Sequence, residues 1–194
     1  MFSTSNLDKK EVVEIICESF SNNPSVMASI KRGGNKQAHL RGLASYAFNT
    51  AKPRNGIHIS SDRNGVAICY PYNYKKETLR DYWNQCKLVV TWIGVRKLFE
   101  VLKREAFIKS KRPSSGDFLY FWFFGVRDRA RGSKIAIELK NEIFDKAGQL
   151  NLPIYLETSV LKNKNVYSRY GFEVYYEWEQ NNGDTLWFMR RLTT

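Results

Sequence analysis

An unbroken apolar segment in the second half of the chain restricts the possible folds more than any other feature. Residues 118–126 read Phe-Leu-Tyr-Phe-Trp-Phe-Phe-Gly-Val, with apolar side chains at odd and even positions alike. Successive side chains of a strand point to opposite faces, so this segment is typical of a central strand covered on both sides. Gly125 near its end indicates a bulge or a close approach of another backbone. We therefore expect a sheet with helices on both faces.

The residues that follow predict a strand-helix-strand unit. Residues 132–150 carry apolar side chains at helical spacing, and residues 153–156 form the next short apolar run. The side chains expected to face the sheet are Ile135, Leu139, Ile143 and Phe144. A crossover of this kind is right-handed and joins parallel strands, so the two apolar runs should form a parallel pair.

Periodicity and turn residues predict the remaining elements. Helices are expected over residues 7–20, from Pro24 to Gly33-Gly34, over residues 37–49, across residues 76–109 with a break near Gly94, and over residues 163–170. Strands are expected at residues 56–60 and 66–70 around Asn64-Gly65, and as a hairpin of residues 172–178 and 185–191. The order predicts an α/β or α+β fold.

Composition bounds the class of protein. The chain has 194 residues, of which 43% are hydrophobic, which suits one globular domain over residues 1–194. No apolar run approaches the roughly 18 residues of a membrane-spanning helix, and the first residues lack the apolar centre of a signal peptide. We therefore expect a cytoplasmic protein without a membrane partner. The net charge of +12 favours an anionic partner but does not identify it.

Cysteine and histidine give no indication of a metal centre. Cys17, Cys69 and Cys86 are widely separated in the chain, which predicts unpaired thiols in a reducing compartment. His39 and His58 stand outside any metal-ligand spacing. No metal is expected.

A basic turn leads from the apolar strand into the following helix. Residues 126–136 read Val-Arg-Asp-Arg-Ala-Arg-Gly-Ser-Lys-Ile-Ala. The first amides of a helix are unpaired and carry about half a positive charge, so the turn with its basic side chains suits a phosphorylated ligand. The alternative is an ordinary turn with solvated charges.

This turn resembles motif A of the GNAT superfamily of N-acyltransferases, which reads Gln or Arg, two variable residues, Gly, one variable residue, and Gly or Ala. Arg131 and Ala136 occupy the first and last positions, and Lys134 stands in place of the middle Gly. In the family the loop amides hold the pyrophosphate of acetyl-CoA. The resemblance thus implies cofactor binding by Arg131, Gly132, Ser133, Lys134, Ile135 and Ala136. The Lys134 side chain either crowds this approach or contacts a phosphate.

A second segment, residues 156–172, is similar to motif B of the same superfamily. There a strand is followed by an Asn, by a Tyr about one helical turn later, and by Gly-Phe. Asn163, Tyr167 and Gly171-Phe172 match these positions, and Asn165 is an alternative for the Asn. Tyr167 could also be an aromatic residue that simply packs on the sheet.

The resemblance implies a GNAT-like fold, with a mixed, mostly antiparallel twisted sheet. It implies an N-acetyltransferase that moves the acetyl group of acetyl-CoA to a primary amine by direct attack, through a tetrahedral intermediate. Backbone groups of Val126 would contact the thioester region, and Asn163 or Asn165, with Tyr170, would contact the rest of the cofactor. Tyr167 would protonate the leaving thiolate.

The base and the acceptor remain open. Glu157, at the end of the second strand of the parallel pair, is the best candidate for a base; a salt bridge to a basic residue or a water chain are the alternatives. The amine acceptor and the oligomeric state are not indicated. Two other functions fit: a GNAT-like protein that binds CoA without catalysis, suggested by Lys134, and a basic nucleic-acid-binding module. The nucleic-acid-binding alternative is disfavoured because many aromatic residues fall in apolar runs, where they are expected to be part of the core.

Overall fold

The computed structural model describes residues 6–23, 35–73, 95–180 and 183–193; of residues 6, 7 and 95–102 it describes the backbone. The helices are α1 (Asn6–Phe20), α3 (Lys36–Ala51), α5 (Val95–Lys111), α6 (Ile135–Leu150) and α7 (Leu161–Arg169), with the 3-10 helices η1 (Lys52–Arg54) and η3 (Asp128–Ala130). The strands are β1 (Ile57–Ile59), β2 (Gly65–Pro71), β3 (Leu119–Val126), β4 (Ile154–Thr158), β5 (Glu173–Glu179) and β6 (Thr185–Arg191). The helix expected from Pro24, the segment 76–94 and Cys86 lie outside the described residues.

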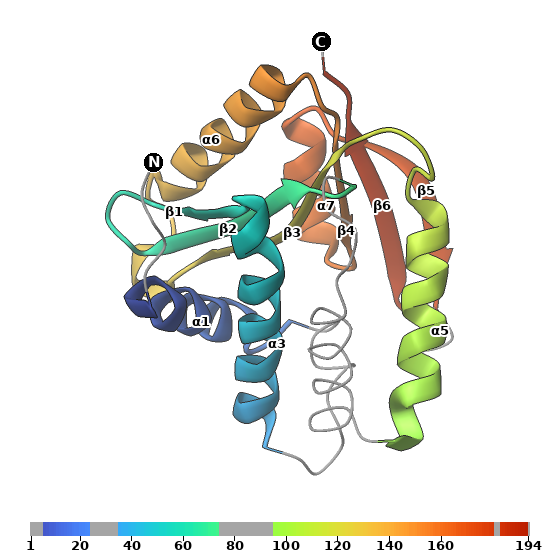
Figure 1. The fold of residues 1–194 in the computed structure, drawn as a ribbon, viewed down its shortest axis with the longest axis horizontal. Coiled ribbons are helices and arrows are strands. Elements are labelled where there is room, and N and C mark those ends of the chain that lie inside the picture. The colour runs from blue at the N-terminus through green and yellow to red at the C-terminus, as the bar shows by residue number, and fades with distance from the viewer. Residues whose placement is uncertain (1–5, 24–34, 74–94, 181–182, 194) are drawn as a thin grey trace.

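The expected fold class is confirmed. The strands form one sheet of six in the order β1-β2-β3-β4-β6-β5. Neighbours are antiparallel except β3 and β4, which form the expected parallel pair at its centre (Figure 1). The crossover between these two strands contains α6, as the amphipathic segment before β4 predicts.

Helices cover both faces of this sheet. On one face α1 and α3 pack against aromatic side chains of β3 and β4, including Tyr120 and Tyr155. On the other face α6 packs against Leu119 and Leu156 of the same strands, as alternation along the strands requires. The C-terminal half of α5 lies over β5 and β6, where Ile108 contacts Phe188 (Figure 1).

A bulge interrupts β3 near its middle. Phe121 pairs with Cys69, and Phe123 pairs with the adjacent Ile68, so Trp122 has no partner on β2. An extra residue shifts the alternation of a strand by one position. Trp122 and Phe123 therefore both lie on the face of α1 and α3. The bulge at Trp122 lies two residues beyond Tyr120, where the pairing of β3 with β4 ends.

Two glycines mark close approaches between elements. A Cβ atom at Gly125 would lie 2.8 Å from Ser19 Oγ, so this glycine makes room for a side chain of α1, not for the backbone or the bulge that the sequence suggested at this position. A Cβ atom at Gly65 would lie 2.4 Å from the Cγ2 atom of Ile135, so Gly65 lets α6 approach β2. The hairpin expected at Asn64-Gly65 is confirmed, but the left-handed residue of its turn is Arg63, with φ 59°.

Helix boundaries differ from expectation at both motifs. The helix expected over residues 132–150 begins at Ile135, because Gly132 has a φ of 83° that no α-helix can contain. The helix expected from Asn163 begins at Leu161. The first change leaves residues 131–134 as an open turn, and the second places Asn163 within the first turn of α7.

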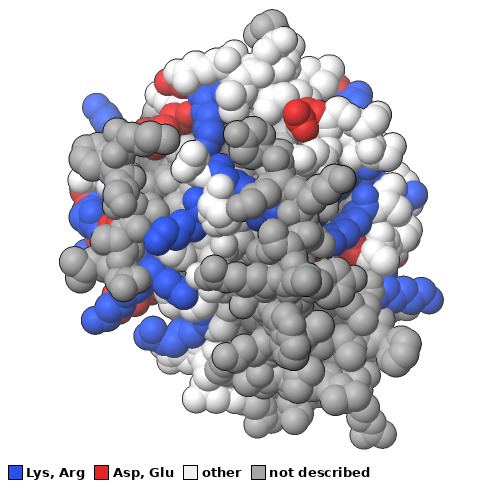
Figure 2. Space-filling view, viewed as in Figure 1, with Lys and Arg blue, Asp and Glu red and all other residues white. Residues whose placement is uncertain are grey.

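The charge is distributed over the described surface. Figure 2 shows more Lys and Arg than Asp and Glu side chains on the face of α3 and α5, spread across it rather than gathered in one patch. None of the described helices is both long enough and apolar enough to span a bilayer.

Candidate active site

The centre of the sheet contains a strand edge without a strand partner. β3 and β4 pair over two residue pairs, the last of which joins Tyr120 to Tyr155. Beyond it, β3 continues along β2 to Val126 and β4 continues along β6 to Thr158 (Figure 1). The facing edges therefore have no strand-to-strand bonds. Such an edge can take up an extended ligand by backbone hydrogen bonds.

Val126, the residue expected to contact the donor, is the last residue of β3 and lies at the end of this edge. Its carbonyl accepts a hydrogen bond of 3.1 Å from Ser19 Oγ, so α1 already uses this oxygen. The amide of the next residue, Arg127, donates to the carbonyl of Asn64 in the β1–β2 turn at 2.8 Å. The strand end that leads into the basic turn is thus held from two sides.

The basic turn presents backbone amides. The amides of Arg131 and Ser133 bond to carbonyls within the turn at 3.3 Å. Among the described residues, the amides of Gly132, Lys134 and Ala136 have no carbonyl acceptor, and the N-cap residue Lys134 makes no side-chain cap. The amide of Ile135 donates to Ser133 Oγ at 3.4 Å. Unpaired amides at a helix N-terminus are a ready site for an anion. The motif A resemblance predicts that the amides of this turn bind the phosphates of the donor.

Most guanidinium groups of the turn already have partners. Arg129 donates to Asn64 Oδ1 at 2.6 and 2.9 Å. Arg131 forms an exposed ion pair with Asp128 at 2.7 Å. Lys134 is exposed and has no ion-pair partner among the described residues. Its ammonium is therefore free to meet an anion beside the unpaired amides.

Helix α7 arranges the motif B residues by its own geometry. Residues four apart share a helix face, so Asn163 and Tyr167 lie on one side, and Tyr170 follows one turn later. Asn165, two residues from each of Asn163 and Tyr167, lies on another side of the helix, and both asparagines are exposed. Asn163 is therefore the asparagine that shares the face of Tyr167.

Tyr167 lies where β3 departs from β4. Its ring packs edge-on against Phe121 of β3 at 6.0 Å and against Phe172 at 5.6 Å between centroids. Burial, and to a smaller extent the neighbouring Tyr170, raises the pKa of the Tyr167 hydroxyl above its ordinary value. The hydroxyl thus carries its proton at neutral pH, as an acid must. The ring is also a packing element, so both roles named for it remain compatible with the structure.

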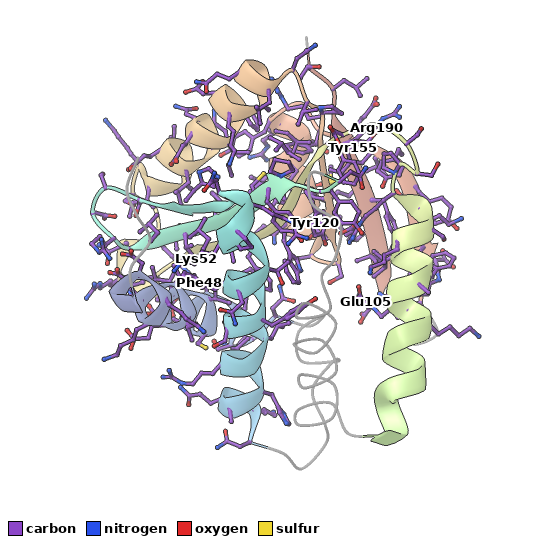
Figure 3. All side chains as sticks on the ribbon, in the orientation of Figure 1. Phe48, Lys52, Glu105, Tyr120, Tyr155 and Arg190 are labelled. Carbon is purple, nitrogen blue, oxygen red and sulfur yellow. The ribbon has the colours of Figure 1, made fainter. Side chains whose placement is uncertain are left out.

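Glu157 is part of a buried ionic cluster that also contains Arg112. The guanidinium of Arg112 donates to both carboxylate oxygens of Glu157, at 2.9 and 3.2 Å, and to the hydroxyl of Tyr120 at 2.7 Å. Tyr120 in turn donates to Glu157 at 2.8 Å, and Arg112 reaches Tyr72 at 3.3 Å. The side chains of Arg112 and Glu157 are 6% and 9% exposed. Figure 3 labels Tyr120 of this cluster and Tyr155, its partner on the neighbouring strand β4.

The charge state of the cluster follows from its contacts. Burial acts to lower the pKa of Arg112, but the neighbouring Tyr120 and Glu157 outweigh it and hold this pKa above its ordinary value. Burial raises the pKa of Tyr120, and Arg112 offsets only part of that effect. The guanidinium is therefore charged and the phenol is neutral. Sequence reasoning left the basic partner of Glu157 unnamed; only the run of basic residues before Pro113 hinted at Arg112.

The two candidate catalytic groups approach the strand edge from opposite faces. Glu157 lies with Tyr120 on the face of α1 and α3, whereas Tyr167 packs among the residues that face α6. The basic turn leads into α6, which covers the same face of the sheet as Tyr167. The face of α6 thus carries Tyr167 and the basic turn, and the face of α1 and α3 carries the Glu157 carboxylate.

The remaining candidates form no metal centre. In the described part of the chain, no three His, Cys, Asp or Glu side chains are placed to hold a metal ion. Cys17 and Cys69 are buried free thiols. His58 lies 2.7 Å from Glu142 on the side of α6, far from the strand edge in the sheet order.

Sequence comparison finds no family model and no curated protein that matches. Comparison of the fold finds acetyltransferases over the whole length. A structure described as histone acetyltransferase HPA2 and related acetyltransferase, from Corynebacterium glutamicum, superposes with a TM-score of 0.70 at 19% identity, with 100% of this chain and 95% of that chain covered.

Two further structures have the same fold. Arylalkylamine N-acetyltransferase 2 from Aedes aegypti gives a TM-score of 0.65 at 18% identity, covering 100% of this chain and 98% of that one. A chain of the NatC complex, solved with Gag peptide and CoA, gives 0.56 at 13% identity, covering 100% and 96%. At these identities the likeness establishes a common fold, that of the GNAT acetyltransferases.

Proposed function

We propose that this chain, which has the GNAT fold, is an acetyl-CoA-dependent N-acetyltransferase acting on a primary amine. One observation carries the proposal: the strand edge that opens between β3 and β4 is followed in the chain, after η3, by the turn before α6 with its unpaired amides. An extended donor with a phosphorylated end needs both features in this order. The related folds include two acetyltransferases by name and one chain of a complex that was solved with CoA.

The residues of the turn fit the phosphorylated end of the donor. The amides of Gly132, Lys134 and Ala136, at the start of α6, have no carbonyl acceptor among the described residues, and the exposed side chain of Lys134 belongs to the same turn. Gly132 adopts its left-handed φ of 83° without strain, and space within 4 Å of its Cβ position is empty. We assign phosphate binding to residues 131–136, and binding of the arm to Asn163 and Tyr170.

The chain's own groups supply the proton transfers. When bound, acetyl-CoA supplies an activated thioester. Glu157 accepts one proton from the incoming ammonium on the face of α1 and α3, and Tyr167 gives its proton to the departing sulfur from the opposite face. The nitrogen releases its second proton to water as the amide forms, and water returns a proton to Tyr167. Because the groups act from the two faces, the amine and the donor can meet at the strand edge without an acyl-enzyme. Holding both reactants there removes most of the entropic barrier.

The basic charge alone does not favour a nucleic-acid-binding module. The aromatic side chains of β3 that would have to stack on bases, such as Tyr120, Phe121 and Phe123, are buried in the core. The net positive charge favours an anionic partner, and a phosphorylated donor is such a partner. The acceptor remains any primary amine.

Acetyl-CoA should stabilise the folded protein. At one hundred times its Kd, the ligand is expected to raise the free energy of unfolding by about 2.7 kcal/mol, because it binds only the folded state. Thermal unfolding with acetyl-CoA measures this shift, and ATP at the same concentration controls for general anion binding. No shift with millimolar acetyl-CoA, or an equal shift with ATP, would contradict the proposal.

Tyr167→Phe should lower kcat about 10²- to 10⁴-fold, because the variant keeps the packed ring but has no proton to give. The KM for acetyl-CoA should change little. Steady-state kinetics with a panel of amines measures both, and Tyr176→Phe on β5 is a matched control for loss of a phenol. Unchanged kcat would remove Tyr167 as the acid, and a parent that binds acetyl-CoA without turnover would be a binding protein.

A further inference from the structure

The last turn of α1 packs against the end of β3 and the start of the basic turn. Glu18 Oε1 accepts the amide of Asp128 at 2.8 Å, and Oε2 accepts from the guanidinium of Arg127 at 3.0 Å. The adjacent Ser19 donates to the carbonyl of Val126. Three successive residues, 126–128, are thus hydrogen-bonded to two successive residues of α1, Glu18 and Ser19.

The bonds of Glu18 are of a strong type. Hydrogen bonds to a carboxylate are charge-assisted, and here one oxygen takes a backbone amide and the other a guanidinium that is 16% exposed. Burial acts to raise the pKa of Glu18, but the Asp128 amide and Arg127 together hold it below its ordinary value. The carboxylate is therefore ionised throughout the neutral range.

A second support lies on the other side of the same segment. The carbonyl of Asn64 accepts the amide of Arg127, and its side chain accepts from Arg129. Between Glu18 and Asn64 the chain enters η3, and from η3 it reaches the unpaired amides of residues 132–136. The direction of these amides therefore depends on how the segment 126–128 is held.

We infer that Glu18 is a positioning residue that fixes the donor-binding turn from the opposite face of the sheet. Glu18 belongs to α1, which covers the face of Glu157, whereas the turn begins the helix that covers the face of Tyr167. Its carboxylate sets the affinity for the donor by holding the turn in its binding geometry before the ligand arrives. This inference rests on the proposed function.

The role of Glu18 is tested by the isosteric variant Glu18→Gln. The variant keeps an acceptor for the Asp128 amide but loses the charge that holds Arg127. We expect the Kd for acetyl-CoA, measured by calorimetry on the free protein, to rise about tenfold. The KM for acetyl-CoA should rise equally, while kcat at saturation and the KM for the amine stay within about twofold.

Glu14→Gln is the matched control, because Glu14 lies on the same helix and approaches Arg127 only to 3.7 Å. It should leave the Kd unchanged. If Glu18→Gln does not fold, Ser19→Ala tests the same support by removing the bond to Val126, with an expected rise in Kd of about threefold.

The outcomes separate the inference from the proposed function. A parent that binds acetyl-CoA together with a folded Glu18→Gln variant of unchanged Kd overturns the role of Glu18 alone. A variant that loses kcat at saturation with its Kd unchanged overturns it as well. A parent that binds no acetyl-CoA overturns both.

Discussion

Arg112→Met is expected to lower the free energy of unfolding by about 3–5 kcal/mol, because it leaves the Glu157 carboxylate buried without its cation. In the folded protein, Arg112 donates to both oxygens of that carboxylate and to the Tyr120 hydroxyl, and its side chain is 6% exposed. Methionine has a comparable length, so the loss reflects the charge and not a cavity. Urea unfolding of the parent and the variant measures the difference.

The control for this prediction is Arg104→Met. Arg104 lies in the C-terminal half of α5, which ends one residue before Arg112. It is 33% exposed, lies 3.6 Å from Glu105 and donates to Gln180 at 3.2 Å. Its replacement should cost no more than about 1 kcal/mol. In the double variant Arg112→Met/Glu157→Gln much of the loss should be recovered, because no buried charge remains. If Arg112→Met and Arg104→Met lower the free energy of unfolding equally, the cluster of Arg112 and Glu157 is open to water.

Glu157→Gln is expected to lower kcat about 10²- to 10⁴-fold, with the KM for acetyl-CoA little changed. The amide retains the shape of the carboxylate and can still accept from Arg112, but it cannot take up the proton of an ammonium. Steady-state kinetics should be recorded well below the unfolding temperature of the variant, because Arg112 is left without its counter-charge. Circular dichroism confirms that the variant is folded under assay conditions.

Glu177→Gln removes the same charge from an exposed position on β5, near Lys164, and should leave kcat unchanged. If Glu157→Gln keeps the parental kcat, Glu157 serves only as the ion-pair partner of Arg112, which is the alternative that the sequence left open. Loss of kcat in both variants would point to the overall charge and not to a base. These results decide between catalytic and structural roles for one buried carboxylate.

The local elements were predictable from the sequence because backbone geometry alone sets their periods. Side chains on both faces of residues 118–126 required a covered central strand, and the amphipathic segment after it required a parallel crossover. Motif B shows the same: the spacing of Asn163 and Tyr167 places both on one face of a single helix. The helix α6 begins at Ile135 and not at Gly132, because the left-handed φ of Gly132 does not fit an α-helix.

The contacts on which the proposed chemistry depends were set by the tertiary structure. Arg112 and Glu157 are 45 residues apart, and Glu18 and Asp128 are 110 apart. Such pairs meet only after the strands have adopted their register, the bulge at Trp122 has bent β3, and helices have packed on both faces. Sequence periodicity reports which face a residue occupies, but not which residue of another element will stand opposite. The sequence by itself thus determined the strand, the basic turn and the helix of Tyr167, while packing decided that Glu157 is held by Arg112 and the turn by Glu18.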